Sequence, residues 1–243
     1  MIENNYQLVE QIWRNYFREQ EVDTVSCYPT LGKLIGFKAS AMLICLLDKK
    51  KMSEEEVIFV GQVLNSLIDY PTFEVSVFDE NKLAFSLTAK LCRELTGFDT
   101  SRSYYIKATP QKKWQRKTQF NDGGRPYEMD LFIQLMDGQH EVAKMAVEYD
   151  GPFHLNEKQV RGDKYRDAHI QSDDIPVFRF PSENQHLKPI DRKADLEERT
   201  RIFVTNISDF FRTKIGQLPV SRNEGGIFNV ASNSTPKGGI FRH

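Results

Sequence analysis

The chain has 243 residues, of which 40% are apolar and 28% charged, and its formal net charge is -1 at pH 7. These values are typical of a globular protein and exclude a chain too polar to build an apolar core. No stretch reaches the roughly 18 apolar residues of a membrane span, and no secretory signal pattern opens the sequence. We therefore expect a cytoplasmic protein without a membrane segment, in which Cys27, Cys45 and Cys92 are reduced thiols.

Apolar residues at helical spacing dominate the first hundred positions. The pattern predicts helices over residues 4–19 and 30–50, and Ser53 with Glu56 forms a capping-box signature in front of a third helix. Residues 70–78 suit a short strand. We expect a helical N-terminal domain over residues 1–100, with a protein partner as one role for its surface.

A further helix is predicted from Asp79, which is a suitable N-cap residue, to Gly97, which is a suitable stop. Its apolar stripe repeats every four residues and comprises Leu83, Leu87, Leu91 and Leu95. This spacing predicts one buried face of a helix.

The stretch from Thr100 to Asn121 contains no acidic residue and mixes basic with aromatic side chains. Such a segment suits either a solvated loop or a surface that attracts a phosphate backbone and stacks on bases. The candidate nucleic-acid-binding residues are Lys107, Lys112, Lys113, Trp114, Arg116 and Lys117.

The remaining elements predict an α/β arrangement. Residues 127–136 and 141–150 alternate in polarity around an Asp137-Gly138 turn signal, which indicates a hairpin. A helix over 157–172, a strand at 175–181 and a helix over 192–215 follow. We expect an α/β sandwich with a small mixed sheet over 101–215, the region that the resemblance described below relates to restriction-endonuclease-like folds, and a flexible tail over 216–243, whose two "GGIF" stretches have no assigned role.

Carboxylates converge at the open end of this hairpin. Asp130 has the opposite parity to its apolar neighbours, and Glu148 and Asp150 share one parity at the end of the second strand. Three carboxylates on one face repel one another unless protons or a cation offset their charge. Oxygen ligands of this kind suit Mg²⁺ or Mn²⁺, which promote phosphodiester hydrolysis.

The run from residue 125 to 185 resembles the RAP domain and is similar to the very-short-patch-repair-like endonucleases, both within the PD-(D/E)XK superfamily. The resemblance depends on Asp130, the octapeptide "VEYDGPFH" at 147–154 and the later strand "VFRF". It implies Asp130 and Glu148 as metal ligands, with Asp150 beside them where most superfamily nucleases carry a lysine. Lys164 or Arg166 is the implied substitute for that lysine, and His154 a proton shuttle or polar contact.

Three functions are compatible with these patterns. The first is a Mg²⁺- or Mn²⁺-dependent endonuclease acting on RNA or DNA. The second is an RNA-binding module of RAP type that does not cut. The third is a protein-interaction adaptor. Each residue also has a plain structural role, because Asp150 and Gly151 suit a turn and Lys164 and Arg166 suit surface ion pairs.

Overall fold

The computed structural model describes residues 27–79, 82–96, 102–115, 126–150, 157–181 and 189–218. The helix expected over residues 4–19 lies outside these ranges, as does most of the expected tail. So do three candidate site residues, His154, Arg116 and Lys117.

Three helices open the described chain. The single helix expected over 30–50 is two, α2 (Tyr28–Ile35) and α3 (Phe37–Asp48), because Gly36 between them has φ 76°. That left-handed conformation favours glycine, and a Cβ there would lie 2.2 Å from the carbonyl oxygen of Pro71. The capping box of α4 (Glu54–Ser66) is confirmed.

The helix predicted from Asp79 to Gly97 is wrong. This stretch instead contains the end of β1 (Glu74–Asp79), then β2 (Ala84–Lys90) and a short 3-10 helix, η2 (Arg93–Leu95). A leucine at every fourth residue fits the period of two of a strand as well as the period of a helix, so the leucine spacing did not distinguish a strand from a helix. Phe85, Leu87 and Ala89 are buried alternately in β2, as a strand requires. The strand expected at 70–78 is confirmed as β1.

Six strands form one mixed sheet in the order β1-β2-β3-β4-β5-β6, which confirms the α/β class. Neighbouring strands are antiparallel except for β5 and β6, which are parallel and therefore need a crossover, supplied by α5. The elements beyond η2 are β3 (Tyr104–Trp114), β4 (Tyr127–Asp137), β5 (His140–Asp150), α5 (Glu157–Gln171), β6 (Val177–Pro181) and α6 (Pro189–Gly216).

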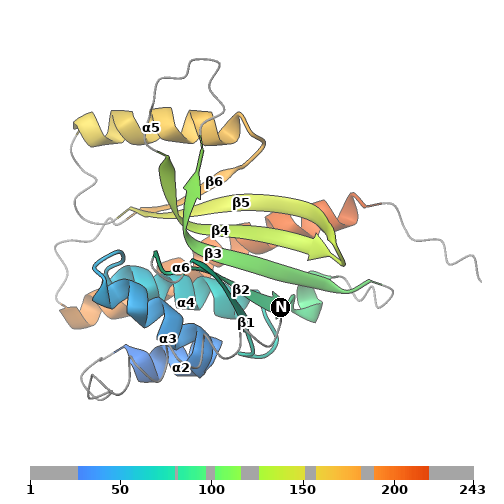
Figure 1. The fold of residues 1–243 in the computed structure, drawn as a ribbon, viewed down its shortest axis with the longest axis horizontal. Coiled ribbons are helices and arrows are strands. Elements are labelled where there is room, and N and C mark those ends of the chain that lie inside the picture. Colours follow the sequence, from blue (N-terminus) through green and yellow to red (C-terminus); the bar gives the residue numbers. More distant parts are fainter. Residues whose placement is uncertain are drawn as a thin grey trace, which may run out of the picture.

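Helices cover both faces of the sheet. In Figure 1, α5 lies on one side, and α2, α3, α4 and α6 lie on the other. The larger apolar cluster joins these four helices to the sheet, and a smaller cluster beneath α5 includes Phe132, Ala146 and Ile170. Phe59 of α4 packs on Phe180 of β6, with ring centroids 4.6 Å apart.

The domain boundary predicted at residue 100 falls between β2 and β3, which are paired neighbours in this sheet. The larger cluster contains residues from both sides of that boundary. Among the described helices, none is long and apolar enough to cross a membrane.

Candidate functional site

The candidate site lies at the carboxyl end of β5, on the face that α5 covers. Ala146 belongs to the smaller apolar cluster beneath α5. Side chains two residues apart on a strand share a face, so Glu148 and Asp150 also point toward α5. The structure agrees with the prediction that these two carboxylates share a face, because each accepts a hydrogen bond from an arginine on this side of the sheet.

Glu148 is the most deeply buried charged residue of the site. Its side chain is 2% exposed, and its Oε2 accepts a hydrogen bond of 2.9 Å from Nη2 of Arg166 on α5. Its other oxygen, Oε1, is buried and has no hydrogen-bond partner among the residues that the structure describes. A buried carboxylate oxygen without a partner costs free energy, so this atom marks a place where a ligand would be stabilised.

Asp130 of β4 lies beside Glu148, held by the backbone. Its Oδ2 accepts a 2.8 Å hydrogen bond from the N–H of Tyr149. In the β3–β4 ladder, Pro110 pairs with Leu131 and Lys112 pairs with Met129. Gln111 and Asp130, which lie between these pairs, are not paired with each other. Gln111 has φ 51°, a left-handed conformation that is costly for a residue other than glycine. Strain of this kind is concentrated at functional sites, and here it lies opposite a candidate ligand.

Glu56 in the first turn of α4 completes the acidic group and was not predicted as a site residue. Its Oε1 accepts a 3.3 Å hydrogen bond from Nε2 of Gln111. Burial and the charge of Asp130 raise the pKa of Glu56 well above its ordinary value. Burial and Asp130 likewise raise the pKa of Glu148, although Arg166 and Arg179 oppose the shift. Asp130 is thus the negative charge shared by both.

Tyr149 connects this acidic group to α4. Its hydroxyl donates a 3.1 Å hydrogen bond to Glu55, and its ring stacks on Phe180. Burial, together with Glu55, raises the pKa of the phenol. One residue therefore orients Asp130 through its backbone N–H and anchors the start of α4 through its side chain.

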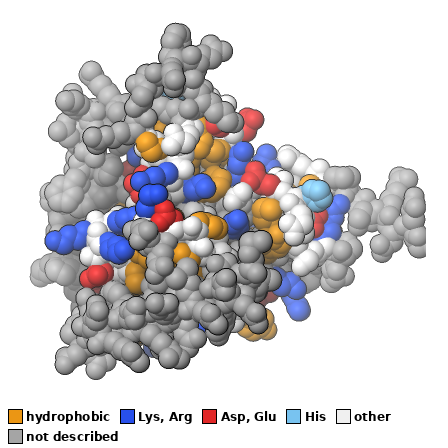
Figure 2. Space-filling view, viewed as in Figure 1, with side chains coloured by type: hydrophobic (Ala, Val, Ile, Leu, Met, Phe, Trp, Pro, Cys, Tyr) orange, Lys and Arg blue, Asp and Glu red, His pale blue; other side chains and the backbone are white. Residues whose placement is uncertain are grey.

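Asp150 belongs to an ion-pair network that joins that of Glu148, because Asp167 lies 3.8 Å from Nε of Arg166. Arg179 of β6 binds Asp150 through Nη1 at 2.5 Å and binds Asp167 of α5 through Nε and Nη2 at 2.6 and 2.7 Å. The bidentate contact fixes α5 against the sheet next to Glu148. Arg179 was not predicted as a site residue. The sequence indicated only that it lies in the "VFRF" strand, and no neighbouring residue indicated that it binds Asp150 and Asp167. Figure 2 shows basic and acidic side chains interspersed in the band between α5 and the opposite helices.

Of the two cations predicted to replace the missing lysine, only Arg166 contacts a candidate ligand. Lys164, two residues earlier on α5, has an exposed side chain. The described part of this group contains the carboxylates Glu56, Asp130, Glu148, Asp150 and Asp167 against the cations Arg166 and Arg179. Negative charge is in excess there.

The donor set suits a hard cation that is held by few protein ligands. Among the described residues, no group of three or more His, Cys, Asp or Glu lies close enough to hold a metal ion. Mg²⁺, however, commonly keeps several waters and binds through one or two carboxylates. Asp130 and Glu148 supply two, and the partnerless Oε1 of Glu148 and the raised pKa of that residue fit a cation. Asp150 is engaged by Arg179 instead.

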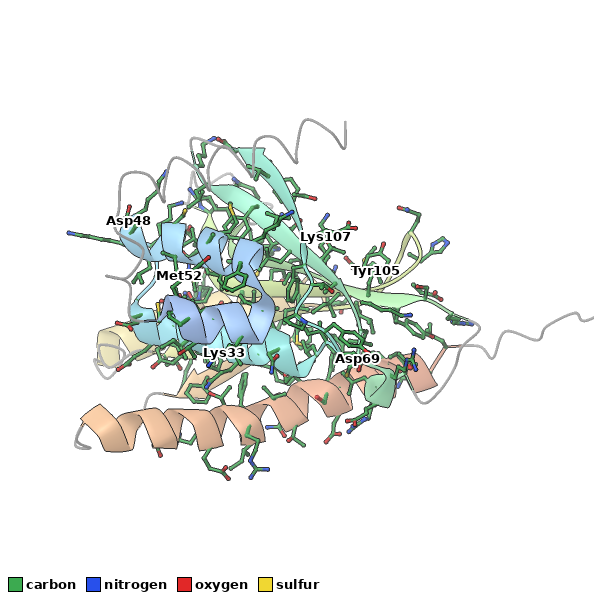
Figure 3. All side chains as sticks on the ribbon, turned by 90° about the horizontal axis from the view of Figure 1, so that it is seen from below. Lys33, Asp48, Met52, Asp69, Tyr105 and Lys107 are labelled. Atoms are coloured by element: carbon green, nitrogen blue, oxygen red, sulfur yellow. The ribbon has the colours of Figure 1, made fainter. Side chains whose placement is uncertain are left out.

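The predicted nucleic-acid-binding residues separate into two places on β3. Lys107 lies in the middle of the sheet beside Tyr105 (Figure 3), with its ammonium 5.6 Å from the ring centre of Phe78. Lys112 and Lys113 are exposed at the other end, about 17 Å further along the strand. Trp114 stacks on Tyr127, with ring centroids 6.1 Å apart. Of the predicted residues that the structure describes, Lys112, Lys113 and Trp114 are the ones near the acidic group.

Comparison with known proteins adds no assignment. No family model matches this chain, and neither a curated protein nor a solved structure does. The site therefore has to be interpreted from its own geometry.

Proposed function

We propose that this protein is a metal-dependent phosphodiester hydrolase acting on nucleic acid. The observation that carries the proposal is Oε1 of Glu148, next to Asp130, a buried carboxylate oxygen without a hydrogen-bond partner in the described part of the chain. The preference for RNA over DNA rests on the resemblance of the 147–154 motif to RAP domains.

The fold supports the same proposal. A hairpin bearing Asp130 and Glu148, a crossover helix and a parallel strand are the parts expected of a restriction-endonuclease-like sandwich. We propose that β3 to α6 form this sandwich and that α4 supplies a further carboxylate, Glu56, at its edge.

The chain's own residues have distinct roles in this mechanism. Asp130 and Glu148 would hold Mg²⁺ or Mn²⁺, an ion that supplies an activated water and offsets charge on the phosphate. Tyr149 fixes Asp130 through its N–H, and Arg179 fixes α5 by binding Asp167. Arg166 is then positioned to donate to a phosphate oxygen, the role that a lysine would otherwise have.

The test is a calorimetric titration with Mn²⁺ followed by a cleavage assay. Native protein is expected to bind Mn²⁺ and to cut labelled RNA or DNA in its presence, whereas Glu148→Gln does neither. Glu141→Gln is the matched control, because Glu141 is on the same strand and pairs with Lys144 away from the site. The absence of heat in both native protein and control would refute the metal site.

A second candidate is a nucleic-acid-binding module without hydrolysis. The ion pairs of Glu148 with Arg166 and of Asp150 with Arg179 favour it, because each neutralises a carboxylate without a metal. Binding of an oligonucleotide that is insensitive to Mn²⁺, with no cleavage products, would support this candidate over the hydrolase.

A further inference from the structure

A row of aromatic rings crosses from α5 to the ends of β3 and β4, next to the acidic group. Tyr165 packs on His169, with ring centroids 4.1 Å apart, and His169 is 6.5 Å from Tyr127. Tyr127 stacks in turn on Trp114 at an interplanar angle of 8°. We call Tyr165, His169, Tyr127 and Trp114 the aromatic row.

The aromatic row is only partly used by the core. Trp114 and Tyr127 pack with one side against the smaller apolar cluster and remain half-exposed, as does His169. Tyr165 is 58% exposed. Since Ile170 already provides the buried contact of α5 with that cluster, Tyr165 is not needed for packing.

Basic side chains border the aromatic row. Lys112 lies two residues before Trp114 on β3 and therefore on the same face, and Lys164 precedes Tyr165 on α5; both side chains are exposed. Phosphate groups are attracted to such a border, while aromatic faces stack on unpaired bases of any sequence. The combination distinguishes a single strand from a duplex, whose bases stack on one another and leave no ring face free.

We propose that the aromatic row is a stacking platform for the bases of a single-stranded nucleic acid, with Lys112 and Lys164 contacting its phosphates. The inference rests on the proposed function, because Arg166, adjacent to Tyr165, then lies beside the same strand. It adds the substrate class: a single strand or an unpaired segment.

Binding is measured by fluorescence anisotropy with fluorescein-labelled 12-nucleotide probes, in buffer containing EDTA so that no divalent ion contributes. The probes are a single strand, its duplex and an abasic strand of equal length. We expect the single strand to bind best. Tyr165→Ala should weaken it by about ten-fold, the cost of removing one base stack. Tyr70→Ala, at a tyrosine that lies elsewhere and is 74% exposed, should have no effect.

Because the assay needs neither metal nor cleavage, its outcome is separate from that of the hydrolase proposal. Equal affinity for the single and abasic strands, or for the duplex, would overturn the stacking platform even if Mn²⁺ binds at Glu148. No binding of any probe would also overturn it and would leave the row as a protein contact. Changing Lys112 and Lys164 to Gln should lower the salt slope by about 0.7 for each phosphate that the variant no longer neutralises.

Discussion

Arg166 on α5 and Glu148 on β5 form an ion pair of 2.9 Å at the centre of the candidate site. A bound cation would compete with this arginine for Glu148, and a substrate phosphate would replace Glu148 as the arginine's partner. Substitution of Arg166 should therefore affect metal binding and phosphodiester cleavage in opposite directions, which allows the two to be measured separately.

Arg166→Met is expected to strengthen Mn²⁺ binding, because it removes a positive charge that competes for Glu148. Cleavage should nevertheless fall, on the order of 100-fold, because a donor to the phosphate is removed. Calorimetry and single-turnover cleavage measure the two effects. If metal affinity and cleavage fell together, Arg166 would instead be a structural partner that holds Glu148 in place.

The stability of the metal-free protein should depend on pH. Glu56 and Glu148 both have a folded-state pKa raised from 4.5 to about 8. The folded state therefore holds protons that the unfolded state has released, and the free energy of unfolding should fall as pH rises from about 4.5 to about 8. Denaturant titrations across this range measure it. Glu148→Gln should reduce the slope, and an unchanged slope would contradict the assignment to Glu148.

Binding of Mn²⁺ should show the opposite dependence on pH. Protons compete with the ion for Glu148, whose pKa is raised to about 8, so affinity should increase between about pH 6 and pH 8 and proton release should accompany binding. Calorimetry in two buffers of different ionisation enthalpy measures the released protons. Binding without proton release would place the ion at carboxylates that are already ionised, such as those on the surface.

Ser53 and Glu56 allow the structural and the site roles of α4 to be separated. Ser53→Ala removes the capping box and should cost about 1 kcal/mol of stability, with little effect on Mn²⁺ affinity. Glu56→Gln retains a side chain suited to the box but removes the charge. It should raise stability at neutral pH, because the folded state no longer has to take up a proton there, and it should alter Mn²⁺ affinity. A loss of stability without a change in Mn²⁺ affinity would restrict the role of Glu56 to capping α4.

Phe59 tests whether the helices and the sheet unfold together. It contacts Tyr149, Phe180 and Phe203, and its truncation to Ala should cost about 3–5 kcal/mol. Because one apolar cluster spans both halves of the predicted domain division, a single thermal transition should move to lower temperature. Two transitions, of which only one moved, would support separate domains at residue 100.

Local patterns in the sequence predicted elements whose periodicity is unambiguous. The hairpin around Gly138, the α4 capping box and the parity of Glu148 and Asp150 all depend on neighbouring residues, and the structure agrees with each. β3 was not predicted as a strand, because its lysines and the internal Pro110 obscure the alternation of Ile106 and Ala108.

Partners distant in the sequence were out of reach for a different reason. Nothing local indicates that Arg179 binds Asp150 and Asp167, or that Gln111 adopts a left-handed backbone opposite Asp130. Glu56 was recognised only as a capping residue. Its second environment exists because the three-dimensional fold brings α4 to the end of β5.

The contact of Phe59 with Phe203 has a consequence for synthesis of the chain. During translation α4 and strands β1 to β6 emerge before α6, so the apolar surface that α6 covers, which includes Phe59 and Phe180, stays open to water until α6 follows. A ribosome-bound fragment that stops at residue 188 should therefore be a ligand for chaperones, and should cease to be one once residue 211 has left the exit tunnel.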